Sequence, residues 1–419
     1  MSITHYPALV RIAPDGNTVT IGGTSVDAFG RVRTSNPLTL FDSSHRFTDN
    51  DLWVDSITGT ASATFSANEG LVNLAVNTAN GDQIIRETKK VFAYQPGKSL
   101  LVMSTFVLGD AKANLRQRVG YYGSDNGVYF ERDGTSLYFV ERSIVTGSVV
   151  NTRVAQANWN QDKLDGTGPS GITLDASKAQ ILYADIEWLG LGTVRMGFVI
   201  NGVFVPAHSF HHANLISTTY ITTASLPLRY EMTNTAATSS ASTLKQVCST
   251  VISEGGYELR GRQQAVGNVV TSPTVLTTAG TTYPVISIRL KSTRLDGIVI
   301  LTALSLLGIT NNANYNWEVV ASGTTTGGTW LSAGTNSCVE YNRTGTSFAI
   351  GSGNVLASGF FQGSNQGSTS IDILKEALFK FQLERNSFTS TPYELTLVCT
   401  SASNGDQVLA SLDWEEISR

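Results

Sequence analysis

Charged residues make up only 15% of this 419-residue chain, well below the roughly one quarter that is usual in globular proteins. The net charge is -4 and Lys and Arg form no dense tract, so the basic surface needed for bulk nucleic-acid binding is missing. Ser, Thr, Asn and Gly replace the charge and favour turns and strands over long helices. Hydrophobic residues still reach 41%, enough for real cores, and the length favours two or three domains.

Cysteine and long hydrophobic runs are also scarce. Cys248, Cys338 and Cys399 are odd in number and widely spaced, which argues against a disulfide framework or a zinc ribbon and predicts small buried residues in a reducing cell.

The N-terminus lacks the apolar core of a cleaved signal. The most apolar run, GIVILTALSLLGI (297–309), is shorter than the about 20 residues needed to cross a bilayer. It predicts a buried strand, and we expect a soluble protein without a membrane partner.

Helical periodicity is nearly absent, and short alternating strands take its place. The run YYGSDNGVYFERDGTSLYFVERS (121–143) joins two aromatic-rich segments through Asp133-Gly134, a dipeptide typical of tight hairpins. The run TVRMGFVINGVFVPAHSF (193–210) repeats this feature with Asn201-Gly202. Such regular strands predict an antiparallel sandwich. Helical spacing occurs only in STSIDILKEALFKF (368–381), so we expect helix in less than about 15% of residues, against the usual third.

The strand-rich pattern starts near residue 46 and is interrupted once. Residues 1–45 have too few apolar positions to close a core alone and are interpreted as an N-terminal docking arm. Residues 46–259 predict the first sandwich, closed by a last strand in LKQVCSTVISEGG. Residues 260–274 are predicted to be a linker, and 275–419 a second β-rich domain. The predicted fold class is therefore all-β, with an extended arm followed by two β-sandwiches.

The strongest candidate for catalysis is the stretch YADIEWLG, in which Asp185 and Glu187 alternate and so project from one face of a strand. Retaining glycosidases with concanavalin-like sandwiches carry a Glu-x-Asp-x-Glu strand, with one Glu as nucleophile and the other as acid. Here Tyr183 stands in place of the first carboxylate. We expect both carboxylates to be structural, either solvated or paired with Arg195 or Arg229. A glycosidase of another geometry is the alternative.

A second candidate is HSFHHAN, where His208 and His212 would share one face of a strand. A structural cluster at a turn is favoured over a metal site, because no HExxH pattern accompanies it.

No nucleophile elbow, phosphate-binding loop or CxxC pair occurs, so no cofactor is predicted. Trp159, Trp317 and Trp330 could stack on sugar rings, but core or rim packing is favoured because Trp usually buries most of its surface.

Two stretches carry a resemblance to a known family. DAFGRVRTSNPLTLFD (27–42) resembles an N-terminal Asp-Ala-Phe-Gly-Arg-x-Arg-x-Ser-x-Pro-x-Thr-Leu-Phe-Asp motif of virion structural proteins of tailed bacteriophages. The later ADIEWLGLGTVRMGFVINGVFVPAHSFHHAN and LPLRYEM are similar to the concanavalin-like jelly-roll sandwich of the same family. Together these stretches cover about the first 260 residues. The resemblance implies a part of a particle, assembled in the host cytoplasm, and not an enzyme.

The residues of the expected arm agree with that implication. An arm without a core must bury its apolar side chains against another surface, while two arginines two positions apart can pair with acidic groups on a neighbour. Proline at position 37 keeps the chain extended before LTLF. The alternative is that these residues are simply the first strands of the sandwich. The expected docking residues are Phe29, Arg31, Arg33, Leu38, Leu40 and Phe41.

Three function classes follow. The first is a non-enzymatic virion component, either a capsid decoration protein or a tail fibre or appendage, that binds other virion proteins as a homo-oligomer and is expected to be a trimer. The second is a receptor-recognition tail protein that binds a host surface glycan. The third and weakest is a glycoside hydrolase.

Overall fold

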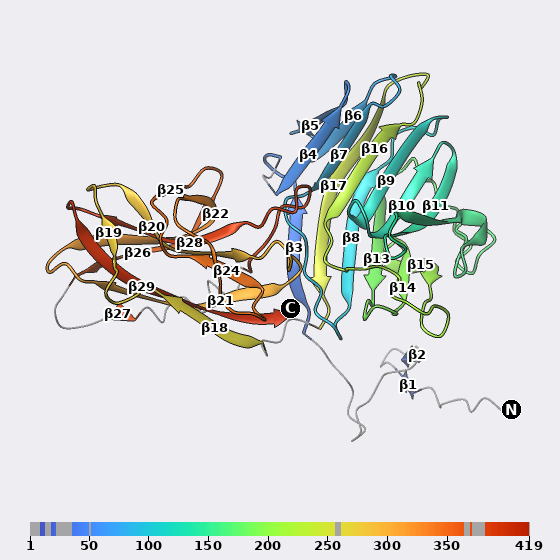
Figure 1. The fold of residues 1–419 in the computed structure, drawn as a ribbon. Helices are drawn as coiled ribbons and strands as arrows, with labels where there is room; N and C mark the ends of the chain where they lie inside the picture. Colours follow the sequence, from blue (N-terminus) through green and yellow to red (C-terminus); the bar gives the residue numbers. More distant parts are fainter. Residues whose placement is uncertain are drawn as a thin grey trace.

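The computed structural model describes residues 9–12, 18–21, 36–49, 52–255, 261–363, 369–370 and 382–418. These residues form strands and one 3-10 turn, η1 (Gln156–Asn158), with no α-helix among them, so the all-β prediction is confirmed for this part of the chain. Two sandwiches lie side by side, the first coloured blue to yellow-green and the second gold to red (Figure 1). No helix within the described ranges is long and apolar enough to cross a membrane.

The first sandwich consists of two antiparallel sheets. The seven-stranded sheet contains, in spatial order, β12 (Val150–Ala155), β11 (Ser136–Ser143), β10 (Gly127–Asp133), β9 (Leu115–Tyr122), β16 (Leu228–Asn234), β7 (Gln83–Thr88) and β4 (Trp53–Thr58). The eight-stranded sheet contains β15 (Val203–Phe210), β14 (Val194–Ile200), β13 (Gln180–Ile186), β8 (Leu100–Val107), β17 (Ser242–Ser253), β6 (Leu71–Val76) and β5 (Ser62–Ser66), with β3 (Leu38–Ser44) paired to β17.

Both hairpins predicted from dipeptides are present. Asp133 pairs with Ser136 around Gly134, whose φ is +63°. Asn201 and Gly202 connect β14 to β15 with φ values of 52° and 77°. Two successive positive φ values are what a two-residue hairpin of the right twist requires, and Asn and Gly tolerate them best. These turns fix the register and thereby decide which side chains face the core.

Aromatic side chains dominate the core between the two sheets. Phe130 of β10 contacts Phe106, Phe139 and Phe198, with ring centroids 6.2, 5.7 and 5.2 Å away. All four rings are at most 1% exposed. Burial of each such side chain contributes about 1.5–3 kcal/mol, so this cluster holds the two sheets together. Trp159 also lies in this core, as predicted.

The second sandwich has a more aliphatic core, in which Trp317 and Trp414 are the largest aromatic groups. The predicted buried strand is β21, which pairs along most of its length with β29. One sheet contains β18 (Arg262–Gly267), β29 (Asp406–Ser418), β21 (Ile298–Gly308) and β27 (Thr369–Ser370), with β19 (Thr274–Leu276) paired to β29. The other contains β23 (Leu331–Ser332), β24 (Val339–Asn342), β20 (Thr282–Leu290), β28 (Glu394–Ser401), β22 (Asn314–Thr326) and β25 (Ser347–Ala349), with β26 (Asn354–Gln362) paired to β22.

Some segments differ from their prediction. The expected linker 260–274 contains β18, which pairs with the C-terminal strand from Arg262 against Glu416 to Gly267 against Ser411. It therefore belongs to the second sandwich. The expected helix at 368–381 lies outside the described residues except for β27, a short strand. A further strand pair, β1 (Leu9–Ile12) with β2 (Thr18–Ile21), lies within the expected arm.

The three cysteines and Trp330 are packing residues. Cys338 and Cys399 are buried and Cys248 is half-buried, and none of the three forms a disulfide bond. Trp330 is half-buried, and the Arg289 guanidinium lies over its ring at 3.9 Å from the centroid.

Hydrogen bonds and an ion pair connect the two sandwiches. The Lys90 ammonium lies 2.9 Å from the Glu384 carboxylate. The Ser387 N–H donates to the Lys89 carbonyl at 3.2 Å, next to a β-bridge between Lys90 and Asn386. Segments 87–94 and 382–387 therefore fix how the second unit sits beside the first.

Candidate functional site

The stretch that carries Asp185 and Glu187 ends strand β13 and enters the loop 187–193. The loop is tight: the Gly192 N–H donates to the Trp188 carbonyl at 2.7 Å, and Leu189 and Gly190 both have positive φ. A Cβ atom at Gly192 would lie 2.0 Å from the Glu187 carbonyl oxygen, so only glycine fits. The loop thus returns the chain to β14 immediately, and both carboxylates face the same hollow.

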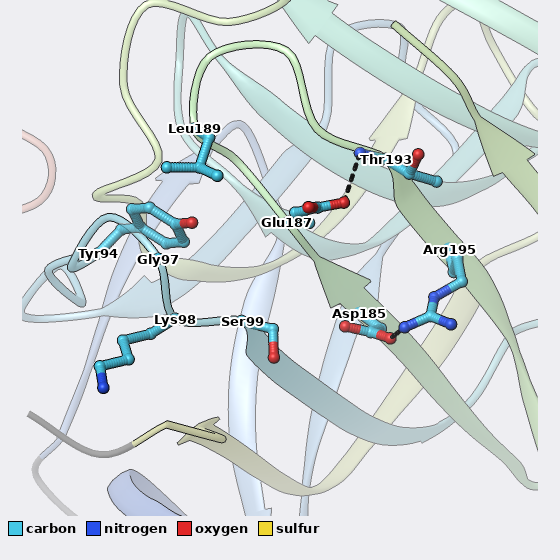
Figure 2. Close-up of a pocket in the computed structure, with 9 residues that line it drawn as sticks. All are labelled: Tyr94, Gly97, Lys98, Ser99, Asp185, Glu187, Leu189, Thr193 and Arg195. Atoms are coloured by element: carbon cyan, nitrogen blue, oxygen red, sulfur yellow. Dashed lines mark hydrogen bonds and ion pairs between the residues drawn. The ribbon is translucent and has the colours of Figure 1, made fainter. Parts of the chain in front are cut away.

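Figure 2 shows this hollow, which we call the sheet hollow; its volume is about 540 Å³. Asp185 forms an ion pair with Arg195 of β14, and Glu187 accepts a long hydrogen bond of 3.4 Å from the Thr193 N–H. Of the two arginines suggested from the sequence as partners, Arg195 is the one that pairs with Asp185. The residues that line the hollow are Tyr94, Gly97, Lys98, Ser99, Asp185, Glu187, Leu189, Thr193 and Arg195.

A second space, the edge hollow, continues the first along the same sheet face. It measures about 600 Å³ and shares Asp185, Thr193 and Arg195 with the sheet hollow. The Phe204 ring, 49% exposed, packs edge-to-face on Tyr183 at 5.0 Å between centroids. The side of the first sandwich therefore offers an aromatic group next to ionic and hydroxyl groups, a combination suited to binding a polar ligand.

Burial shifts the pKa of two side chains that line the hollows. Burial raises the pKa of the Asp185 carboxyl, although Arg195 opposes the shift. Burial raises the pKa of Tyr183 to about 12, so this phenol stays protonated at neutral pH and supplies neither a base nor a nucleophile. A retaining glycosidase needs two carboxylates free to act as acid and nucleophile. Here one is held by an arginine, and a neutral phenol stands where a third would be.

The two histidines of the second candidate separate in the structure. His208 lies on β15, packs edge-to-face on Phe210 and accepts a hydrogen bond from the Asn160 N–H at 3.3 Å. Burial lowers the pKa of His208 to about 4. His212 lies beyond the strand end, so the two do not share a strand face as expected. In the described part of the chain, His, Cys, Asp and Glu side chains form no group of three or more that could hold a metal ion.

His212 instead links the loop 187–193 to the seven-stranded sheet through hydrogen bonds. Its Nδ1 lies 2.5 Å from the Gly192 carbonyl oxygen, its Nε2 lies 2.8 Å from the Glu141 carboxylate, and its ring stacks on Tyr220. Both neighbours of the ring are hydrogen-bond acceptors, which favours the cationic ring with a proton on each nitrogen. Burial opposes this charge, but the bonds to Glu141 and Gly192 raise the pKa of His212 overall.

The opposite outer face of the first sandwich carries a buried ionic network that sequence reasoning missed. Arg118 of β9 donates to Glu131 of β10 at 2.6 Å and to Glu231 of β16 at 3.0 Å. The three residues alternate with core residues such as Val119, so they project outward, yet none is more than 8% exposed. Burial alone would raise the pKa of Glu231, but Arg118 and other arginines lower it.

Arg229, the other partner suggested for Asp185, belongs to this network. It lies 3.5 Å from Glu87 and 3.9 Å from Glu231. The available signal was the alternation of charged with apolar residues in LRYEM (228–232). This alternation predicts charged side chains on the outer face of a strand, but it does not predict which strands lie next to each other.

The structure divides the expected docking residues into two groups. Phe29, Arg31 and Arg33 lie outside the described residues. Leu38, Leu40 and Phe41 belong to β3, an integral strand of the eight-stranded sheet that pairs with β17. Phe41 is 6% exposed and its ring contacts Trp53 and Phe92, Leu40 packs against the same core, and only Leu38 is exposed. All three residues therefore belong to a strand of the sandwich. For Leu40 and Phe41 the core supplies a better apolar environment than an arm in water.

No family model matches this chain, and no curated protein matches it. Several solved structures are similar. A Bacteroides ovatus mixed linkage glucan GH16 protein in complex with a G4G4G3G product has 10% identity and a TM-score of 0.35, covering 51% of this chain and 99% of its own. The CBM2 module of the Lactobacillus casei BL23 phage J-1 evolved Dit has 4% identity and a TM-score of 0.34, covering 54% and 100%.

Arcelin-5, a lectin-like defense protein from Phaseolus vulgaris, has 8% identity and a TM-score of 0.32, covering 52% of this chain and 99% of its own. With TM-scores below 0.5, these likenesses establish no function for the chain.

Proposed function

We propose that this chain is a non-enzymatic structural protein of a tailed-bacteriophage particle, assembled in the host cytoplasm as a homo-oligomer and joined to other virion proteins by its N-terminal segment. The observation that supports this most is the motif at 27–42, which resembles that of phage virion proteins and whose last residues form β3. The segment before β3 is thereby tethered to the sandwich at Leu38. Docking through Phe29, Arg31 and Arg33 can leave the core intact.

Two truncations test this proposal. Removing residues 1–35 keeps β3, so the protein should melt at the same temperature but should no longer enter particles. Removing residues 1–45 also deletes Phe41 from the core and should cost at least the about 3–5 kcal/mol of a buried Phe→Ala change. The measurements are thermal melting and the amount of protein in purified particles.

The full-length double variant Arg31→Ala/Arg33→Ala is the matched control for charge. It should reduce incorporation only modestly, because exposed ion pairs are worth about 0–1 kcal/mol each. Normal incorporation of the protein lacking 1–35 would refute the docking role.

The hollows on the first sandwich favour a second function, binding of a surface glycan. Aromatic rings beside hydroxyl and carboxylate groups can stack on sugar rings and bond their hydroxyls. Because Arg195 holds the Asp185 carboxylate in an ion pair, binding without cleavage is the expected outcome. A panel of bacterial surface polysaccharides should include at least one that binds the purified protein and releases no reducing sugar. Release of reducing sugar that Glu187→Gln abolishes would show that the chain is a glycosidase.

A further inference from the structure

A third hollow lies between the two sandwiches and extends the candidate site onto the second unit. This inter-unit hollow, about 770 Å³, is lined by residues 222–225 of the first sandwich and by the loop 292–297 of the second. Tyr94 borders both this hollow and the sheet hollow. Trp188 lies between Glu187 and Leu189 in the chain: it faces the inter-unit hollow, while its two neighbours face the sheet hollow.

The three hollows therefore follow one another across the molecule. The edge and sheet hollows share Asp185 and Arg195, and the sheet and inter-unit hollows meet at Tyr94. The first two alone cross from β15 to β8, three strand spacings or roughly 14 Å. We call the whole series the trough. A single sugar would fill only part of it.

We propose that the trough binds one extended polysaccharide chain that contacts both units, with the loop 292–297 supplying the far end of the site. This rests on the proposed glycan binding and adds its chain length and the role of the second sandwich. The far end offers hydroxyl groups of Ser292 and Thr293 and the charged groups of Arg294 and Asp296. Trp188, packed edge-to-face on Tyr94 at 5.6 Å, supplies the apolar surface.

The chemistry of the trough excludes other polymers. The trough has more carboxylates than cations, so it lacks the positive excess that a nucleic acid needs. The carboxylates are Asp185, Glu187, Glu254 and Asp296, and the cations are Lys98, Arg195 and Arg294. A peptide strand would add to an exposed sheet edge, whereas the trough crosses β13 and β14 over their faces. A neutral, hydroxyl-rich polymer suits mixed hydroxyl, amide and aromatic lining.

The test uses the full-length protein and a polysaccharide that binds it in a panel of purified bacterial capsular and lipopolysaccharide glycans. Fragments of that polysaccharide, from a disaccharide to a dodecasaccharide, are titrated by calorimetry. Affinity should rise with length beyond the short fragments that the sheet hollow can hold. Arg294→Ala should weaken binding of the longest fragment about tenfold, the loss expected for one hydrogen bond to a charged group, and leave the shortest unchanged.

Thr293→Trp, which fills the inter-unit hollow from an exposed position, should have the same selective effect. Arg262→Ala is the matched control, since Arg262 is an exposed arginine of the second unit that does not line the trough. Equal affinity for short and long fragments, or equal loss for both in the Arg294 and Thr293 variants, would overturn the inference while leaving glycan binding in place. Failure of every polysaccharide in the panel to bind would overturn the glycan proposal and this inference with it.

Discussion

The first sandwich has two outer faces built from the same kinds of side chain, but they pair those side chains differently. On the seven-stranded sheet, Arg118 lies between Glu131 and Glu231, and all three are nearly inaccessible to solvent. On the eight-stranded sheet, Asp185 is paired with an arginine whose side chain is 61% exposed, and Glu187 is itself exposed. We call the outer face of the seven-stranded sheet, whose charges are buried, the closed face. The outer face of the eight-stranded sheet, whose charges are exposed to solvent, is the open face.

The difference predicts that the two faces respond differently to substitution and to a bound ligand. A ligand on the closed face would have to break buried charge pairs, whose loss leaves an uncompensated charge in a low-dielectric setting. A ligand on the open face replaces water at exposed groups, which costs far less. Arginine and carboxylate groups therefore form a buried network on one face and stay open to solvent on the other.

The largest expected loss of stability comes from removing one carboxylate of the buried network on the closed face. Glu231→Ala leaves Arg118 and Arg229 without their shared carboxylate, and removing one partner of a buried pair costs about 3–5 kcal/mol. The urea midpoint should fall accordingly with an unchanged slope. Glu187→Gln, on the open face, is the matched control and should stay within about 0.5 kcal/mol of the wild type. A loss below about 1 kcal/mol for Glu231→Ala would show that the closed face does not stabilise the fold.

An intermediate effect is expected at His212, which joins the open face to the other sheet. Its pKa is raised above the ordinary 6.5, so its stabilising contribution is complete below about pH 6.5 and is lost as the pH rises through the folded value. Each unit of increase is worth about 1.4 kcal/mol. Urea unfolding from about pH 6 to pH 9 should show a decline in the wild type that His212→Asn removes.

His208 provides the internal control for that experiment. Its pKa is lowered to about 4, so its contribution is present above about pH 6.5 and is lost only as the pH falls toward 4. His208 therefore adds no slope on the alkaline side. An identical alkaline slope in wild type and His212→Asn would contradict the assigned charge on His212.

The smallest effect is expected from the Asp185–Arg195 pair of the open face. Because Arg195 is largely exposed, a double-mutant cycle with Asp185→Asn and Arg195→Ala should give a coupling of about 0–1 kcal/mol in stability. The same variants should change binding of any glycan that the panel identifies. Strong coupling in stability with no change in binding would reverse the roles assigned to the two faces.

Local chemistry was enough to predict the all-β class and several of its elements. Asp133-Gly134 and Asn201-Gly202 determined two hairpins, because few other dipeptides accept positive φ at the required positions. The apolar run at 297–309 determined a buried strand, since it has no polar face to turn outward. The pairing of Asp185 with Arg195 was also predictable, since these residues oppose each other across one hairpin.

Long-range pairing was not predictable in the same way. Strand β18 is mostly exposed and looks like a linker, and it becomes a strand only because residues 411–416, far along the chain, lie beside it. Leu38, Leu40 and Phe41 were interpreted as an arm because their partner strand β17 lies about two hundred residues later. An edge strand carries little pattern of its own, since its stability comes from the neighbour it joins.

The sequence by itself therefore determined the all-β class, two hairpin turns and the buried strand at 297–309. Only the tertiary structure decided which face is closed: Glu231 meets Arg118 across 113 positions of sequence, and Tyr94 meets Trp188 across the end of the sandwich. The physical reason is that turns depend on backbone angles of adjacent residues, whereas charge burial and hollows depend on sheet order, which strands settle by pairing over long distances.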